Sequence, residues 1–179
     1  MCCGVLASAI AWSAPALAEA PRIDASPSFL ARRDDHIHRQ EALFGYLTGA
    51  AALSLAGGAA LWIWDPPGFA GKPREYRTSF ATLALVYGAL NAAFVAASFA
   101  GLGPQRERLT NDAALDWDRR HQARIYAANA GLDMIYITLG FTLWATDKRP
   151  IVQGMGASLA VQGGLLFGLD GGGAAIMTR

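Results

Sequence analysis

Four long apolar stretches alternate with charged segments along the chain. The apolar stretches cover about residues 42–64, 79–102, 125–145 and 151–169, and they lack the broad polar face of a helix on the surface of a soluble protein. As helices they are about long enough to cross the ~30 Å hydrocarbon core of a bilayer. The pattern therefore predicts an all-α fold, an integral membrane four-helix bundle formed by residues 42–170.

The residues before the first apolar stretch divide into two parts. Residues 1–18 are mostly apolar and end in Ala16-Leu17-Ala18, a small-x-small cleavage pattern, so we expect a signal peptide there. No Lys or Arg precedes the apolar residues of this segment, as it would in a typical signal peptide. The alternative is that the segment is an uncleaved fifth span. Residues 19–41 are expected to form a polar, amphipathic arm at the membrane interface, with Ser28 as a helix N-cap. Residues 171–179 are expected to form a short tail.

Glycines and prolines mark the expected ends of the helices. The motifs are Asp65-Pro66-Pro67-Gly68, Gly103-Pro104, Pro150 and Asp170-Gly171-Gly172-Gly173. The first two and the last end helices, and Pro150 starts one. The charged segment 105–122 is expected to be a partly helical loop, with Asn111 or Asp112 as the cap of its helical part.

Small residues recur at helical spacing within the apolar stretches. The sets are Gly45 and Gly49, Gly57 and Gly58, Gly88 with Ala92 and Ala96, and Gly154 with Gly156. Small side chains let membrane helices approach closely, so we expect these faces to form helix contacts.

The net charge and the positions of Lys and Arg bear on a nucleic-acid partner and on the orientation in the membrane. The net charge is +1, which gives no reason to expect a nucleic-acid partner. A cleaved leader places the arm outside the cytoplasm and predicts a cytoplasmic membrane that the chain crosses several times. The arm and residues 105–124 carry more Lys and Arg than the two opposite loops, which is the reverse of the positive-inside preference. We adopt the orientation that the leader implies.

A polar stripe interrupts the third apolar stretch. Asn129, Asp133 and Tyr136 share one helix face, and Tyr87, Asn91 and Gln162 are polar positions in the neighbouring stretches. A carboxyl in a membrane helix normally faces the bundle interior and marks a site for a proton, a cation or a ligand. The structural alternative is an interhelical hydrogen bond from Asp133 to Asn91, Gln162 or Tyr87. With a single acid at this depth, the sequence favours the structural role.

Three histidines and several charged residues are expected at one membrane face. His36, His38 and His121 are weak candidates for a metal or haem site, because such a site needs a cluster of ligands and no catalytic spacing is present. The sequence therefore predicts no cofactor and no catalytic residue. Asp170 is expected at the interface, either ending its helix or pairing with Arg124 or His121. Arg124 and its neighbours Arg119 and Arg120 can bind lipid phosphates or act as ordinary helix-end charges.

The last third of the chain resembles an uncharacterised family of small bacterial four-span membrane proteins, a domain of unknown function. One matching segment is Asn129-Ala130-Gly131-Leu132-Asp133 followed by Tyr136, Gly140 and Leu143. The other is Gly154-x-Gly156, then Gln162-Gly163-x-Leu165-Leu166 and Asp170, and Asn91 matches a further asparagine. The resemblance implies a leader and four spans, and it implies no activity.

Three functions remain open from the sequence. The first, which the sequence favours, is a non-enzymatic packing or assembly subunit. Such a subunit would form a homo-oligomer or belong to a larger membrane complex, and it would also contact the lipid bilayer. The second is a small carrier or ion or proton pathway lined by Asp133, Asn129 and Gln162. The third is a metal or haem site at His36, His38 and His121.

Overall fold

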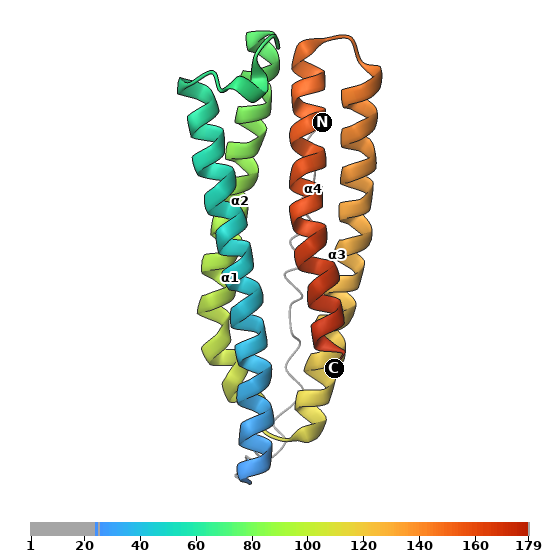
Figure 1. The fold of residues 1–179 in the computed structure, drawn as a ribbon. Coiled ribbons are helices and arrows are strands. Elements are labelled where there is room, and N and C mark those ends of the chain that lie inside the picture. Colours follow the sequence, from blue (N-terminus) through green and yellow to red (C-terminus); the bar gives the residue numbers. More distant parts are fainter. Residues whose placement is uncertain (1–23, 25, 179) are drawn as a thin grey trace, which may run out of the picture.

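The computed structural model describes residue 24 and residues 26–178, which form four long helices and one short 3-10 helix (Figure 1). The helices are α1 (Pro27–Ile63), η1 (Pro67–Phe69), α2 (Arg74–Arg108), α3 (Asp112–Thr146) and α4 (Pro150–Met177). These described residues contain no strand, so the predicted all-α class is confirmed. The expected signal peptide, residues 1–18, lies outside the described residues.

The four long helices form two antiparallel hairpins. α1 packs along α2 and α3 packs along α4, while α4 also contacts α2 and, less extensively, α1. The turn that contains η1 and the α3–α4 turn lie at one end of the bundle, and the α2–α3 turn lies at the other (Figure 1). We call the second end, which holds the start of α1, the α2–α3 turn and the end of α4, the charged end.

α1 is continuous from the arm into the first apolar stretch. Its N-cap is Ser26 rather than Ser28: Ser26 is extended (φ −61°, ψ 136°), and its hydroxyl oxygen accepts a hydrogen bond from the Phe29 N–H at 3.3 Å. Pro27 occupies the first helical position, where its missing N–H leaves no intrahelical bond unmade. The cap therefore precedes the proline, and the arm is the first part of a membrane-length helix.

α2 continues through Pro104 to Arg108, so the expected stop at Gly103-Pro104 is wrong. A proline inside a helix costs about 3 kcal/mol, and tertiary packing beyond it has to offset that cost. The packing is present: Leu102 and Leu109, on either side of the proline, are buried in a cluster at the charged end. The cluster also contains Phe29, Ile37 and Leu115.

The α2–α3 connection is correspondingly short, because α3 begins at Asp112. Asn111 caps α3, and its side-chain oxygen accepts a hydrogen bond from the Ala114 N–H at 2.9 Å. The predicted cap at Asn111 is therefore confirmed. The segment 105–122 is largely the end of one helix and the beginning of the next, where a longer loop was expected.

Large apolar side chains point outward along the length of the bundle. Examples are Leu53 on α1, Phe94 on α2, Ile135 and Phe141 on α3, and Ile151 on α4, all of them more than half exposed. Among the described helices α1, α2 and α4 are long and apolar enough to cross a membrane. α3 is as long as α2, but its apolar part contains Asn129 and Asp133, which lower its hydropathy.

Candidate functional site

α3 and α4 approach each other along residues spaced seven apart, the repeat of a left-handed coiled coil. On α3 these residues are Tyr126, Asp133 and Gly140, and on α4 they are Gly156, Gly163 and Asp170, all buried. A Cβ added to Gly140 would lie 2.5 Å from the backbone nitrogen of Ala160 and 2.7 Å from the carbonyl oxygen of Gly156. A Cβ added to Gly163 would lie 3.1 Å from the carbonyl oxygen of Asp133. The backbones of α3 and α4 are therefore in contact at Gly140, Gly156 and Gly163, next to the acids Asp133 and Asp170.

The carboxyl groups of Asp133 and Asp170 lie within hydrogen-bonding reach of each other across this interface. Asp133 is 3% exposed and Asp170 is 7% exposed. Two carboxylates cannot donate to one another, so a hydrogen bond between the two groups requires a proton on one of them. We call Asp133 and Asp170 the carboxyl pair.

Polar and aromatic groups surround the carboxyl pair. The Asn129 side chain, one turn before Asp133 on α3, lies within hydrogen-bonding reach of Asp170. Tyr126 is close enough to Asp170 to interact with it electrostatically, and its ring packs against the backbone at Gly173, where an added Cβ would lie 2.8 Å from ring carbons. The Oδ2 atom of Asp133 is buried and accepts no hydrogen bond from an N–H or hydroxyl donor of the described residues. Asp133 therefore depends on the carboxyl of Asp170 as its polar partner.

Asp170 reaches Asp133 because α4 does not end where the sequence indicated. The helix passes through Gly171, Gly172 and Gly173 and continues to Met177. The expectations that Asp170 ends its helix and that residues 171–179 form a tail are therefore wrong. Asp170 lies inside α4 on the face that contacts α3, seven residues after Gly163.

A further predicted polar residue, Gln162, contacts a different helix from Asp170. Gln162 faces α1, where its Oε1 atom accepts a hydrogen bond from the Ser54 hydroxyl at 3.0 Å, and both side chains are buried. Tyr136 on α3 and Tyr87 and Asn91 on α2 are half-buried. Asp133 meets Asp170, which corrects the expected hydrogen bond to Asn91, Gln162 or Tyr87.

The three histidines have separate partners. His38 is exposed and lies 2.8 Å from Glu41, and the His121 ring stacks on Trp117 with centroids 4.8 Å apart. His36 is 2% exposed, and its Nε2 atom lies 2.8 Å from Oδ2 of Asp118 on α3. In the part of the chain that the structure describes, no group of three or more His, Cys, Asp or Glu residues is placed to hold a metal ion.

Neither of the expected partners of Asp170 reaches it. His121 stacks on Trp117, and the side chain of Arg124 is exposed at the charged end, where it lines a pocket. Asp170 instead lies next to Asp133 and Asn129. The interface set predicted from Asp170, Arg124 and His121 is therefore not brought together.

A second buried polar cluster was not predicted from the sequence. Asp118 Oδ2 accepts a hydrogen bond from the Gln105 side chain at 2.7 Å and also contacts His36, and the Gln40 amide nitrogen lies 2.9 Å from His36 Nε2. The cluster ties α1, α2 and α3 together at the charged end. No local pattern signals it, because its residues come from three helices.

Residues 46–171 match the model of one protein family, which is described as a family of unknown function (DUF6992). The match extends over most of the four-helix region, so the likeness is wider than the last third of the chain. No curated protein and no solved structure matches the chain.

Proposed function

We propose that this chain, which belongs to the DUF6992 family, is a four-span integral membrane protein. In this proposal it binds and releases a proton at the carboxyl pair and acts as a small proton-coupled carrier or pathway. The observation that supports this role is the contact between Asp133 and Asp170. A lone acid favours a structural role, whereas a buried pair is a group that can take up and give back a proton.

The proposed membrane placement has all four long helices crossing a bacterial inner membrane, with the start of α1 outside. Three helices have the length and composition for this. α3 is proposed as the fourth span, because it pairs with α4 along its length and presents apolar side chains outward. Those side chains include Leu132, Ile135, Leu139 and Phe141. Asp133, the acid in the apolar part of α3, faces α4 and is shielded from lipid, as intramembrane carboxyls normally are.

The chemistry of the pair follows from its charge. With one proton present, the hydroxyl of one carboxyl donates to the oxygen of the other, and the pair carries a single negative charge. Loss of that proton leaves two negative charges, which at ~4 Å and an effective dielectric constant of about 20 repel by roughly 4 kcal/mol. Repulsion of this size favours separation of α3 and α4 around Asp170. Asn129 can then donate its amide N–H to one carboxylate.

Proton flux into liposomes that contain the purified full-length protein tests this proposal. We expect a pH-sensitive dye inside the liposomes to report flux for the wild type, and we expect Asp133→Asn and Asp170→Asn each to abolish it. Glu75→Gln, which removes an exposed acid at the other end of the bundle, is the matched control and should retain full flux. Wild-type flux no greater than that of protein-free liposomes, or equal flux for all variants, would refute the proposal.

A second candidate function, an assembly subunit, is supported by a different observation. Gly45 and Gly49 lie one turn apart on α1, and an added Cβ at either would meet no atom within 4 Å. This predicted packing face makes no close contact within the described residues, so it is free to contact another helix in the membrane. If it does, Gly49→Leu should shift the mass of the detergent-solubilised complex downward. Gly101→Leu, at an equally open position on α2, should leave the mass unchanged.

A further inference from the structure

Three arginines of α3 lack acidic partners at the charged end. Arg119, Arg120 and Arg124 form no ion pair within the described residues, although acids are plentiful nearby. Other arginines at this end are paired: Arg32 with Asp112 at 2.7 Å, and Arg106 with Asp34 at 2.9 Å. The contrast identifies the first three as a local excess of positive charge.

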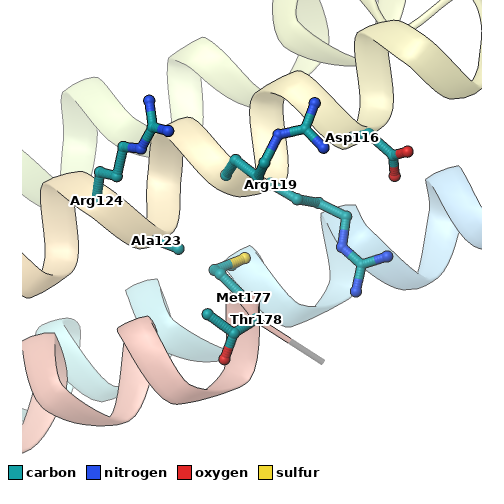
Figure 2. A pocket seen from close by; sticks show the side chains of 7 residues that line it. Asp116, Arg119, Ala123, Arg124, Met177 and Thr178 are labelled. Atoms are coloured by element: carbon teal, nitrogen blue, oxygen red, sulfur yellow. The ribbon is translucent and has the colours of Figure 1, made fainter.

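These arginines line a pocket of about 480 Å³ between the start of α3 and the end of α4 (Figure 2). Met177 and Thr178 contribute the α4 side, and Ala123 and Asp116 complete the α3 side. The volume falls within the range of small-molecule sites, about 300–1,000 Å³. The pocket therefore combines space, cationic donors and some apolar lining.

A smaller pocket of about 220 Å³ adjoins it and shares Arg119 and Met177. Its other two arginines are already engaged: Arg32 pairs with Asp112 at 2.7 Å, and Arg39 pairs with Asp35 at 2.8 Å and donates to the carbonyl oxygen of Ile176 at 3.2 Å. The contacts of Arg39 fix the end of α4 against α1. In the larger pocket, by contrast, the cationic side chains have N–H donors without an acidic partner.

The spacing of the three arginines favours an anion as the occupant. Arg120 and Arg124 are four residues apart on one helix, where like charges destabilise each other. An anion between them removes that repulsion, and the guanidinium group, with five N–H donors in a planar fork, matches the oxygens of a phosphate group. The single acid in the lining, Asp116, offsets only one of the three charges.

We propose that the pocket formed by Arg119, Arg120, Arg124 and the end of α4 binds a phosphate group. The group belongs either to the headgroup of an anionic phospholipid or to a free phosphate compound. The apolar part of α3 begins at Ile125, directly after Arg124, which places the pocket at headgroup level in the proposed membrane. The lipid source rests on the proposed membrane placement, and binding of free phosphate does not depend on it.

Two arms of one experiment distinguish the sources. In the first, inorganic phosphate is titrated by calorimetry into full-length protein in a phosphate-free maltoside detergent. In the second, nanodiscs of phosphatidylcholine with phosphatidylglycerol are solubilised, and the phosphatidylglycerol retained on the protein is measured by native mass spectrometry. The variants are Arg120→Gln/Arg124→Gln and the charge-matched control Arg74→Gln/Lys148→Gln, which removes two exposed cations from the opposite end.

The pocket variant is expected to lose at least roughly tenfold in affinity in the arm where the wild type binds, while the control variant binds like the wild type. Selective retention of phosphatidylglycerol over phosphatidylcholine identifies a lipid, and binding of inorganic phosphate alone identifies a soluble ligand. An unchanged helical circular dichroism spectrum shows that the variant is folded. Absence of wild-type binding in both arms, or equal binding by both variants, overturns the proposal. Failure of the proton-flux test would leave this outcome untouched.

Discussion

The close contact of α3 and α4 predicts opposite effects for two glycine substitutions on the same helix. A Cβ at Gly156 would lie 2.6 Å from the backbone nitrogen of Trp144 and 2.7 Å from the carbonyl oxygen of Gly140. Both are backbone atoms, so a new methyl group can be accommodated only if the helices move apart. A Cβ at Gly164 would meet no atom within 4 Å.

The magnitudes follow from two competing terms. Replacing glycine by alanine inside a helix gains about 0.5–1 kcal/mol of helix propensity at both positions. Overpacking costs typically 1–3 kcal/mol, and at Gly156 it acts between backbones that cannot rotate away. We therefore expect Gly156→Ala to lower the free energy of unfolding by about 1–2 kcal/mol. Gly164→Ala should leave it unchanged or raise it by up to about 1 kcal/mol.

Unfolding of the purified protein in mild detergent, followed by circular dichroism, measures both effects. The midpoint temperature of Gly156→Ala should fall by several degrees relative to Gly164→Ala. Equal midpoints for the two variants, or a higher one for Gly156→Ala, would refute the close backbone contact and with it the geometry that brings Asp133 to Asp170.

Three further predictions concern the charged end and the α3–α4 turn. Asn111→Ala removes the α3 N-cap and should lower the free energy of unfolding by about 0.5–2 kcal/mol in the same assay, and no change would exclude the cap. Asp118→Ala leaves the buried His36 without its carboxylate partner and should cost about 1–3 kcal/mol, whereas a neutral result would show that the cluster is not tightly held. Hydrogen bonds from Arg149 lower the pKa of Asp147 to about 2 from 3.8, so the stabilisation by this contact is complete above pH 3.8 and is lost as the pH falls through about 2. Arg149→Gln should move the Asp147 carboxyl titration, followed by nuclear magnetic resonance, back toward 3.8, and a wild-type midpoint already near 3.8 would contradict the contact.

The apolar stretches located the four helices and residue type located the cap at Asn111, because these are local features. The predicted helix ends at Pro104 and at Gly171–Gly173 were wrong, because both helices continue through these residues. Proline and glycine weaken a helix locally, but in α2 the packing of Leu102 and Leu109 holds the turn that contains Pro104. In α4 the glycines remain helical because the residues around them are packed: Leu169 and Met177 are buried, and Gly173 lies against the ring of Tyr126.

Of the two acids in the carboxyl pair, one could be identified from the sequence. Asp133 stood out as a carboxyl in an apolar stretch, and Asn129 shared its helix face. Its partner did not stand out, because three glycines after Asp170 indicated a helix end at the membrane surface. Helix periodicity shows which residues share a face, and it does not show which residue of another helix lies opposite. The seven-residue spacing from Gly156 through Gly163 to Asp170 was the one available signal.

Infrared difference spectroscopy of the carboxyl pair in reconstituted protein tests the account most directly. We expect the wild type at neutral pH to show the C=O stretching band of one protonated, hydrogen-bonded carboxyl, and we expect this band to disappear when the proton is released at higher pH. Asp133→Asn and Asp170→Asn should each remove the band, because an asparagine N–H replaces the shared proton as donor to the remaining carboxylate. A wild type with no such band, or a band that survives in Asp170→Asn, would contradict the claim that the two acids hold one proton between them.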